Sequence, residues 1–262
     1  YCYWGIFLNY FCDFHRVQQK HLKNIDISNF NTGNAISMET IFGNCHSLVN
    51  LDVSSFNTSK VNNMKEMFRG CSSLTEIIIP NSVTSIGEHA FEYCNALTEI
   101  TIPNGVTSIE EGTFVSCKAL TKINIPNGVT SIGEDAFFLC SALTEITIPN
   151  SVKSIDAWIF REFTSLNSVT IPKCVAENNG HIFADCENLT SVVILEGTTR
   201  IGSGIFGGCK RLTDINIPKS VTSIDKHAFC NCSSLTSITI PDKVTEIGMQ
   251  TFSGCTSLTE IN

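Results

Sequence analysis

The chain repeats a short alternation of apolar and polar residues that ends each time at a proline. In one copy, Ile77 and Ile79 alternate with Glu76 and Ile78, and Pro80 follows. A period of two predicts a β-strand with one buried face. Proline cannot donate a ladder hydrogen bond, so it ends the strand. All seven prolines occupy this position: Pro80, Pro103, Pro126, Pro149, Pro172, Pro218 and Pro241.

A second apolar segment follows each strand. Val83 and Ile86 predict a short extended piece, and Gly87 comes next. Most equivalents of Gly87 are residues that tolerate a positive φ, which predicts a left-handed turn here with strain at the exception, Glu110. The equivalents are Glu110, Gly133, Asp156, Asn179, Gly202, Asp225 and Gly248.

The repeat then closes with a spacing typical of a helix. Ala90, Phe91 and Cys94 lie at i, i+1 and i+4, which predicts one face of a single helical turn. We expect the phenylalanines of successive units to stack into a core. They are Phe42, Phe68, Phe91, Phe114, Phe137, Phe160, Phe183, Phe206, Phe229 and Phe252.

The leucine that opens each unit fixes the period. Leu22, Leu48 and Leu74 lie 26 residues apart, and every later interval, up to Leu258, is 23 residues. The period predicts an α/β repeat solenoid with one parallel β-sheet face and short helical turns, because each unit buries its apolar side only against its neighbours.

This period also divides the chain. Residues 22–73 form two 26-residue repeats, and residues 74–262 form eight 23-residue repeats and part of a ninth. Residues 1–21 do not fit the register, which predicts an atypical N-terminal segment, either a cap or the end of a fragment.

The 23-residue units resemble the BspA-type, or treponemal, leucine-rich repeat. The unit 120–142 carries every fixed position of that pattern, namely Leu120, Ile123, Ile125, Pro126, Val129, Ile132, Gly133, Ala136, Phe137 and Cys140. The 26-residue units, with Leu51–Ser73, resemble the surface-protein repeat that often accompanies this family. The resemblance implies a leucine-rich-repeat stack, mostly surface-exposed or secreted, with some adhesin members for host or matrix proteins. It implies no catalytic residues.

Charge and hydropathy exclude two classes of partner. The net charge of −8 without basic clusters disfavours nucleic acid. No run reaches the roughly 18 apolar residues that span a bilayer, so we expect no membrane insertion.

The candidate chemistry is sparse. Nine of the thirteen cysteines recur at the repeat position, a spacing that matches no zinc motif, so we interpret them as buried structural thiols rather than ligands or bridges. The histidines pair with no nucleophile by motif, and the glycines belong to the repeat turns. The sequence therefore predicts no enzyme, no metal and no cofactor.

Two adjacent units depart from the pattern. Phe163 replaces the repeat cysteine, Cys174 and Asn178 change the unit from Leu166, and Leu195 and Thr198 replace proline and valine. These units either bend the solenoid, form a site, or reflect neutral drift in a tolerant array.

The outward strand positions are the candidate binding surface, since solenoids often bind partners there. We predict a non-enzymatic, adhesin-like module that binds an extracellular or host protein or glycan at the cell surface or after secretion. A structural spacer and the targeting part of a larger enzyme stay open. The candidate ligand-binding residues are Glu76, Glu99, Lys122, Asn124, Glu145 and Thr147.

Overall fold

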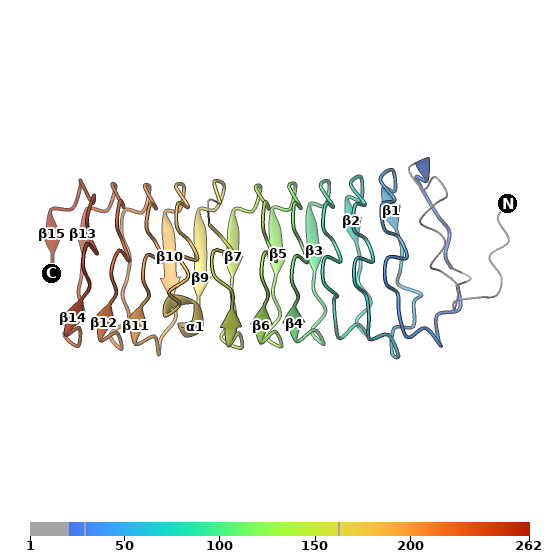
Figure 1. Ribbon diagram of the computed structural model, residues 1–262, viewed down its shortest axis with the longest axis horizontal. Coiled ribbons are helices and arrows are strands. Elements are labelled where there is room, and N and C mark those ends of the chain that lie inside the picture. Colours follow the sequence, from blue (N-terminus) through green and yellow to red (C-terminus); the bar gives the residue numbers. More distant parts are fainter. Residues whose placement is uncertain (1–20, 29, 162) are drawn as a thin grey trace.

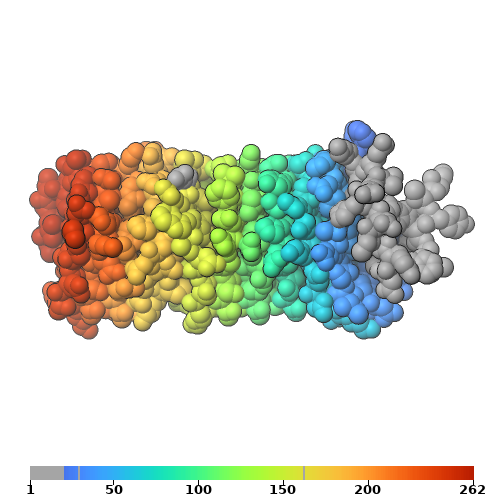
Figure 2. Space-filling model, viewed as in Figure 1, coloured from blue at the N-terminus to red at the C-terminus, as the bar shows by residue number. Residues whose placement is uncertain are grey.

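The computed structural model describes residues 21–28, 30–161 and 163–262. There the backbone coils into an elongated solenoid of parallel strands, as the repeat predicted (Figure 1). The space-filling view shows the turns as successive bands along the rod (Figure 2), so sequence neighbours are also the neighbours in space. The prediction of an N-terminal cap falls, apart from His21, on residues outside the described ranges.

The first ladder of strands contains the predicted sheet face. Its strands are parallel and keep the register of the repeats, with Asn50 opposite Glu76 in the long units and Glu99 opposite Lys122 in the short ones. Its members are β1 (Asn50–Leu51), β2 (Glu76–Ile77), β3 (Glu99–Thr101), β5 (Lys122–Asn124), β7 (Glu145–Thr147), β9 (Ser168–Ile171), β10 (Ser191–Ile194), β13 (Ser237–Ile238) and β15 (Glu260–Ile261).

The short extended piece of each repeat forms a second ladder, so the solenoid has two sheet faces rather than one. Ser131 pairs with Ser108 on one side and with Ser154 on the other. The strands are β4 (Ser108–Ile109), β6 (Ser131–Ile132), β8 (Ser154–Ile155), β11 (Arg200–Ile201), β12 (Ser223–Ile224) and β14 (Glu246–Ile247). Isoleucine is the buried residue of every strand except β14, whose Ile247 is exposed, and this ties the ladder to the same core.

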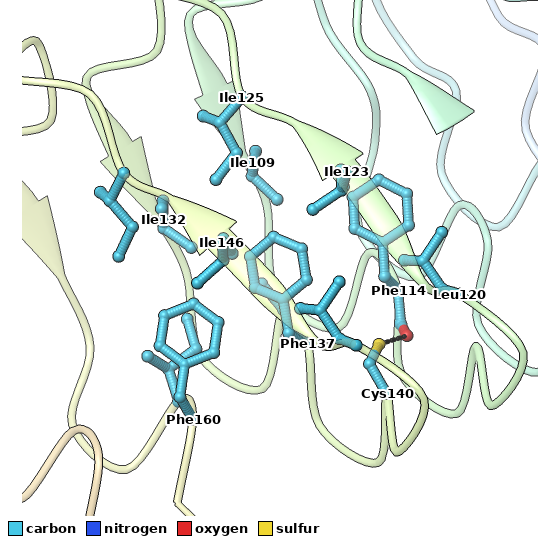
Figure 3. Close-up of a cluster of buried hydrophobic side chains, with 14 of the residues drawn as sticks. Ile109, Phe114, Leu120, Ile123, Ile125, Ile132, Phe137, Cys140, Ile146 and Phe160 are labelled. Atoms are coloured by element: carbon cyan, nitrogen blue, oxygen red, sulfur yellow. Dashed lines mark hydrogen bonds between the residues drawn. The ribbon is translucent and has the colours of Figure 1, made fainter. Parts of the chain in front are cut away.

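The core is a set of columns, each built from one repeat position. The rings of Phe114, Phe137 and Phe160 stack with centroids 5.6 and 5.4 Å apart, and all three side chains are fully buried. Figure 3 shows this stack beside the isoleucines of both ladders. The predicted phenylalanine core is confirmed.

The predicted helical turns are wrong. The only α-helix in the described residues is α1 (Lys173–Ala176), which lies elsewhere in the repeat. After Gly87 the amides of His89 and Phe91 donate to carbonyls of the next repeat, at 2.9 Å each. The amides of Ala90 and Glu92 instead fold back three residues. Because alternate N–H groups are needed between the repeats, an α-helix, which uses them internally, cannot form.

The left-handed turn also lies elsewhere than predicted. Gly87 is not in the positive-φ region, nor is Glu110, so the strain expected at Glu110 is absent. Instead, two positions per repeat, represented by His89 (φ 54°) and Tyr93 (φ 62°), have positive φ. Gly87 is required for another reason. A Cβ there would lie 2.6 Å from the carbonyl carbon of Met64 and closer still to the amide nitrogen of Lys65.

The irregular unit interrupts the second ladder between β8 and β11, where α1 precedes the missing strand. Side chains replace the lost backbone pairing. The Asn178 amide donates to the carbonyl of Ile155 at 3.1 Å. A Glu177 carboxylate oxygen accepts from the amides of Thr199 (2.6 Å) and Arg200 (3.2 Å). These side-chain hydrogen bonds take the place of the missing backbone bonds, so the irregular unit still stacks on its neighbours.

Candidate functional site

The six predicted site residues lie on the first ladder, and all are exposed. Register places Glu99 opposite Lys122 and Thr101 opposite Asn124. Glu145 faces Ser168 in the next pair of strands. Within the described residues, none of the four charged side chains forms an ion pair. Their charges therefore face solvent in one row, about 4.8 Å apart per step.

A threonine column borders this row. The hydroxyl of Thr98 donates to the carbonyl of Thr75 at 3.3 Å, and Thr121 donates likewise to Thr98 at 3.2 Å. Each hydroxyl thus donates its hydrogen bond to a carbonyl of the preceding repeat, so only its acceptor lone pairs remain for a ligand. This column was not predicted from the sequence, although a threonine recurs at this position in nearly every repeat.

The third side of the solenoid is formed by the positive-φ turns, and it carries the exposed aromatic side chains. Trp158, Phe138 and Tyr93 are each nearly half exposed. The Trp158 ring stacks on His181 with centroids 5.0 Å apart, and the Arg161 guanidinium lies 4.7 Å from its centroid. This cluster was not predicted from the sequence. The available signal was a tryptophan at a repeat position that elsewhere holds Thr40, Glu66, His89, Gly112, Asp135, His181, Gly204, His227 and Gln250.

An ionic cluster lies on the same side, near the junction of the long and short repeats. Glu92 is buried, and its Oε2 lies 2.8 Å from Arg69 Nε and 3.2 Å from His89 Nδ1. Lys65 pairs with Glu88 at 2.6 Å across two repeats. A Cβ on Gly112 would overlap the His89 ring, so glycine makes room for this imidazole. We interpret the cluster as a structural contact between neighbouring repeats, because its charges neutralise one another.

The repeat cysteines are free thiols, and all of them except the partly exposed Cys255 are buried. Cys94 Sγ donates to the carbonyl of Phe68 at 3.2 Å. Burial raises the pKa of Cys94, Cys140 and Cys186 to about 12 each. A thiol attacks or binds metal as the thiolate, so these groups are poorly suited to either task. No group of three or more potential metal-binding side chains occurs among the described residues.

No helix of the described residues is long and apolar enough to cross a membrane.

Comparisons with solved structures found leucine-rich repeat proteins. A leucine-rich repeat protein from Eubacterium ventriosum is 26% identical over 81% of this chain and 63% of its own, with a TM-score of 0.59. The leucine-rich repeat protein of T. pallidum is 33% identical over 63% and 72%, with a TM-score of 0.50. A leucine-rich cell surface protein from Faecalibacterium prausnitzii is 27% identical over 86% and 75%, with a TM-score of 0.40. No curated protein matches the chain.

The family comparison covers nearly the whole sequence. The model of the BspA type Leucine rich repeat region matches six copies, over residues 14–117, 62–190 and 177–262. These matches include the 26-residue and the 23-residue units alike. The chain therefore belongs to the BspA-type leucine-rich repeat family.

Proposed function

We propose that this protein is a non-enzymatic interaction module of the cell-surface or secreted type, which binds its partner with the first ladder. One observation carries the proposal: four charged side chains stand in an exposed row on a rigid parallel ladder, without an ion pair to any described residue. Exposed side chains without ion pairs contribute little to stability, so these four remain available to a partner. Leucine-rich-repeat stacks commonly use an extended sheet face to bind proteins.

The chemistry of the row indicates the kind of partner. Glu76, Glu99 and Glu145 are acidic, and Lys122 lies in the same row. A cationic surface of an extracellular or host protein would complement it, with Asn124 and Thr147 as hydrogen-bonding neighbours. Adhesin-like binding of matrix protein is the form we favour, and a glycan ligand is the second.

The test is a charge swap. The variant Glu76→Lys with Glu99→Lys is compared with the parent for binding to immobilised fibronectin and laminin over a salt series. We expect the parent to bind and to weaken with salt, because exposed charges are screened, and the swap to abolish binding. The free energies of unfolding of the two proteins should agree to within about 0.5 kcal/mol.

A matched control separates this row from overall charge. Glu196→Lys with Glu246→Lys makes the same change in charge at exposed positions outside the first ladder. It should keep the parent's binding. Loss of binding in the control would indicate a net-charge effect instead of a site.

The spacer alternative has its own observation. The threonine hydroxyls of the column donate their hydrogen bonds to carbonyls within the solenoid. Many outward side chains of the first ladder from Ser168 onward are small and neutral, which suits a rigid rod. A parent that binds neither matrix protein would favour the spacer. The targeting part of a larger enzyme is the third candidate. We propose the division into residues 1–21, 22–73 and 74–262 on the repeat lengths alone.

A further inference from the structure

The turn side of the solenoid, formed by the positive-φ turns, changes in side-chain size along the rod. Phe138, Leu139 and Trp158 come from two adjacent repeats and are 49%, 48% and 48% exposed. Large apolar side chains that gather on a surface are typical of a contact with another molecule. Later repeats hold smaller residues at the same positions, namely Gly207 and Cys230 in the Phe138 column, Gly208 and Asn231 in the Leu139 column, and Gly204 in the Trp158 column.

One column of the turn side carries opposite charges at equal distances from its middle. The carbonyls of Gly180 and Lys226 accept hydrogen bonds from the preceding turns at 2.9 and 3.1 Å, so the column keeps the 23-residue register. Glu134 and Lys226 are exposed, and neither side chain forms an ion pair with a described residue. Two unpaired charges of opposite sign therefore lie two repeats before and two repeats after Gly180. The column consists of Glu134, Ala157, Gly180, Ser203 and Lys226.

A second copy of the same surface complements this column. A two-fold axis that lies in the interface and crosses the rod at Gly180 reverses the order of the repeats, so each column faces itself. Glu134 of one copy then lies opposite Lys226 of the other, and the contact occurs twice. In a parallel pair the same column would oppose glutamate to glutamate. The residues near the axis are small, and a Cβ on Gly180 would lie 2.5 Å from the Cβ of Ala157. The two main chains can therefore approach closely there.

The same axis matches the large apolar side chains to small ones. Phe138, two repeats before the axis, lies opposite Cys230, and Trp158, one repeat before it, lies opposite Gly204. The Trp158 ring stacks on His181 with centroids 5.0 Å apart, so the indole is already ordered and loses little side-chain entropy on contact. Burial of this exposed apolar surface on both copies would supply the favourable free energy.

Side chains in the repeat of the axis face their own counterparts, so they must not repel strongly. Burial, and then the positive charges of His227, Arg161 and Lys226, lower the pKa of His181, which leaves its imidazole uncharged at neutral pH. Asp185 lies 3.6 Å from the Arg161 guanidinium, which compensates its charge. The net charge of −8 opposes self-association in general, but this part of the turn side is locally balanced.

We propose that the turn side from Glu111 to Met249 binds a second copy of this chain, as an antiparallel two-fold dimer centred on Gly180. Seven repeats at about 4.8 Å per step give a contact about 30 Å long. A contact of this length along one side of a narrow rod is at the low end of specific interfaces, so the dimer should be weak and reversible. The first ladder lies on a different side of the solenoid, so the proposal does not depend on binding there.

The test is an exchange of charges across the axis, followed by sedimentation equilibrium from about 1 to 200 μM protein at low salt. We expect the parent to dimerise with a Kd of about 1–100 μM. Lys226→Glu and Glu134→Lys should each weaken the dimer at least about tenfold, because each places like charges opposite one another twice. The double variant restores opposite charges at both contacts, so its Kd should return to within about threefold of the parent's.

Matched controls separate this contact from overall charge. Lys243→Glu and Glu196→Lys make the same single changes at exposed positions outside the turn side, and both should keep the parent's Kd. Phe138→Ser should weaken the dimer while its melting temperature stays that of the parent. A parent that is monomeric throughout the concentration range would overturn the proposal. So would single charge variants that dimerise like the parent, or a double variant that stays as weak as the single ones.

Discussion

The thiol of Cys140 donates a hydrogen bond of 3.1 Å to the carbonyl of Phe114, which lies 26 residues earlier in the chain (Figure 3). The cysteine thus joins its own repeat to the preceding one. The same bond recurs between Cys117 and Phe91. A cysteine at this position is small enough for the stack and still supplies a donor, which explains its recurrence without any redox role.

Thiol reactivity should follow burial. Native protein is treated with N-ethylmaleimide, and the modified cysteines are located by peptide mass. Cys140 is fully buried with a pKa of about 12, whereas Cys230 is partly exposed. Burial raises the pKa of Cys230 as well, but its side chain is partly accessible to the reagent, so we expect Cys230 to react roughly a hundredfold faster or more. Equal rates in native protein would refute the packed column, and unfolding should equalise them.

Stability should fall at alkaline pH because of the same column. The pKa of Cys94 is raised from 9.0 to about 12 in the folded chain. Its contribution is therefore complete below pH about 9 and is lost as the pH rises toward 12, at up to about 1.4 kcal/mol per pH unit for each such thiol. Urea midpoints of the reduced protein at about pH 8 and about pH 10 measure this.

The control for this alkaline effect is Cys94→Ala with Cys140→Ala. The double variant is less stable at neutral pH, but it should lose less stability between the two pH values than the parent. Tyrosines and lysines titrate equally in both proteins and so cancel in the comparison. An identical loss in both would show that the thiols are not the cause.

The phenylalanine column should dominate the stability of the array. Phe137 stacks on Phe114 and Phe160 and is fully buried. Phe137→Ala should lower the free energy of unfolding by about 3–5 kcal/mol, as the cost of lost burial plus a cavity. Exposed Thr147→Ala should change it by less than about 0.5 kcal/mol. Urea unfolding followed by circular dichroism measures both, and similar losses would be incompatible with the assigned core.

The close approach at Gly87 gives a backbone test. Gly87→Ala forces a Cβ against the main chain of Met64 and Lys65, which cannot move without disturbing the stack. We expect a loss of at least about 2 kcal/mol. Gly33→Ala is the control, since its Cβ would meet nothing nearer than an Asn31 side-chain atom at 3.4 Å. A Gly87→Ala protein as stable as the control would remove the steric argument.

The sequence could not predict several features, because they depend on contacts across the stack. Asn178 and Glu177 look like defects in a repeat pattern, and only the neighbouring repeats reveal Ile155, Thr199 and their hydrogen bonds. The stacking of Trp158 on His181 follows the 23-residue period, but no repeat pattern indicates that the Arg161 guanidinium lies 4.7 Å from the centre of the indole.

The sequence by itself determined the period, the parallel register and the columns of buried Leu, Ile, Phe and Cys, because a stack of equal repeats must place like positions on one another. It also identified the outward row from Glu76 to Glu145. The tertiary structure decided how the segment from Ala90 to Cys94 folds. The spacing of its apolar residues suits a helix, yet alternate N–H groups of this segment donate to carbonyls of the next repeat. The segment therefore forms turns with two positive-φ residues per repeat instead of a helix.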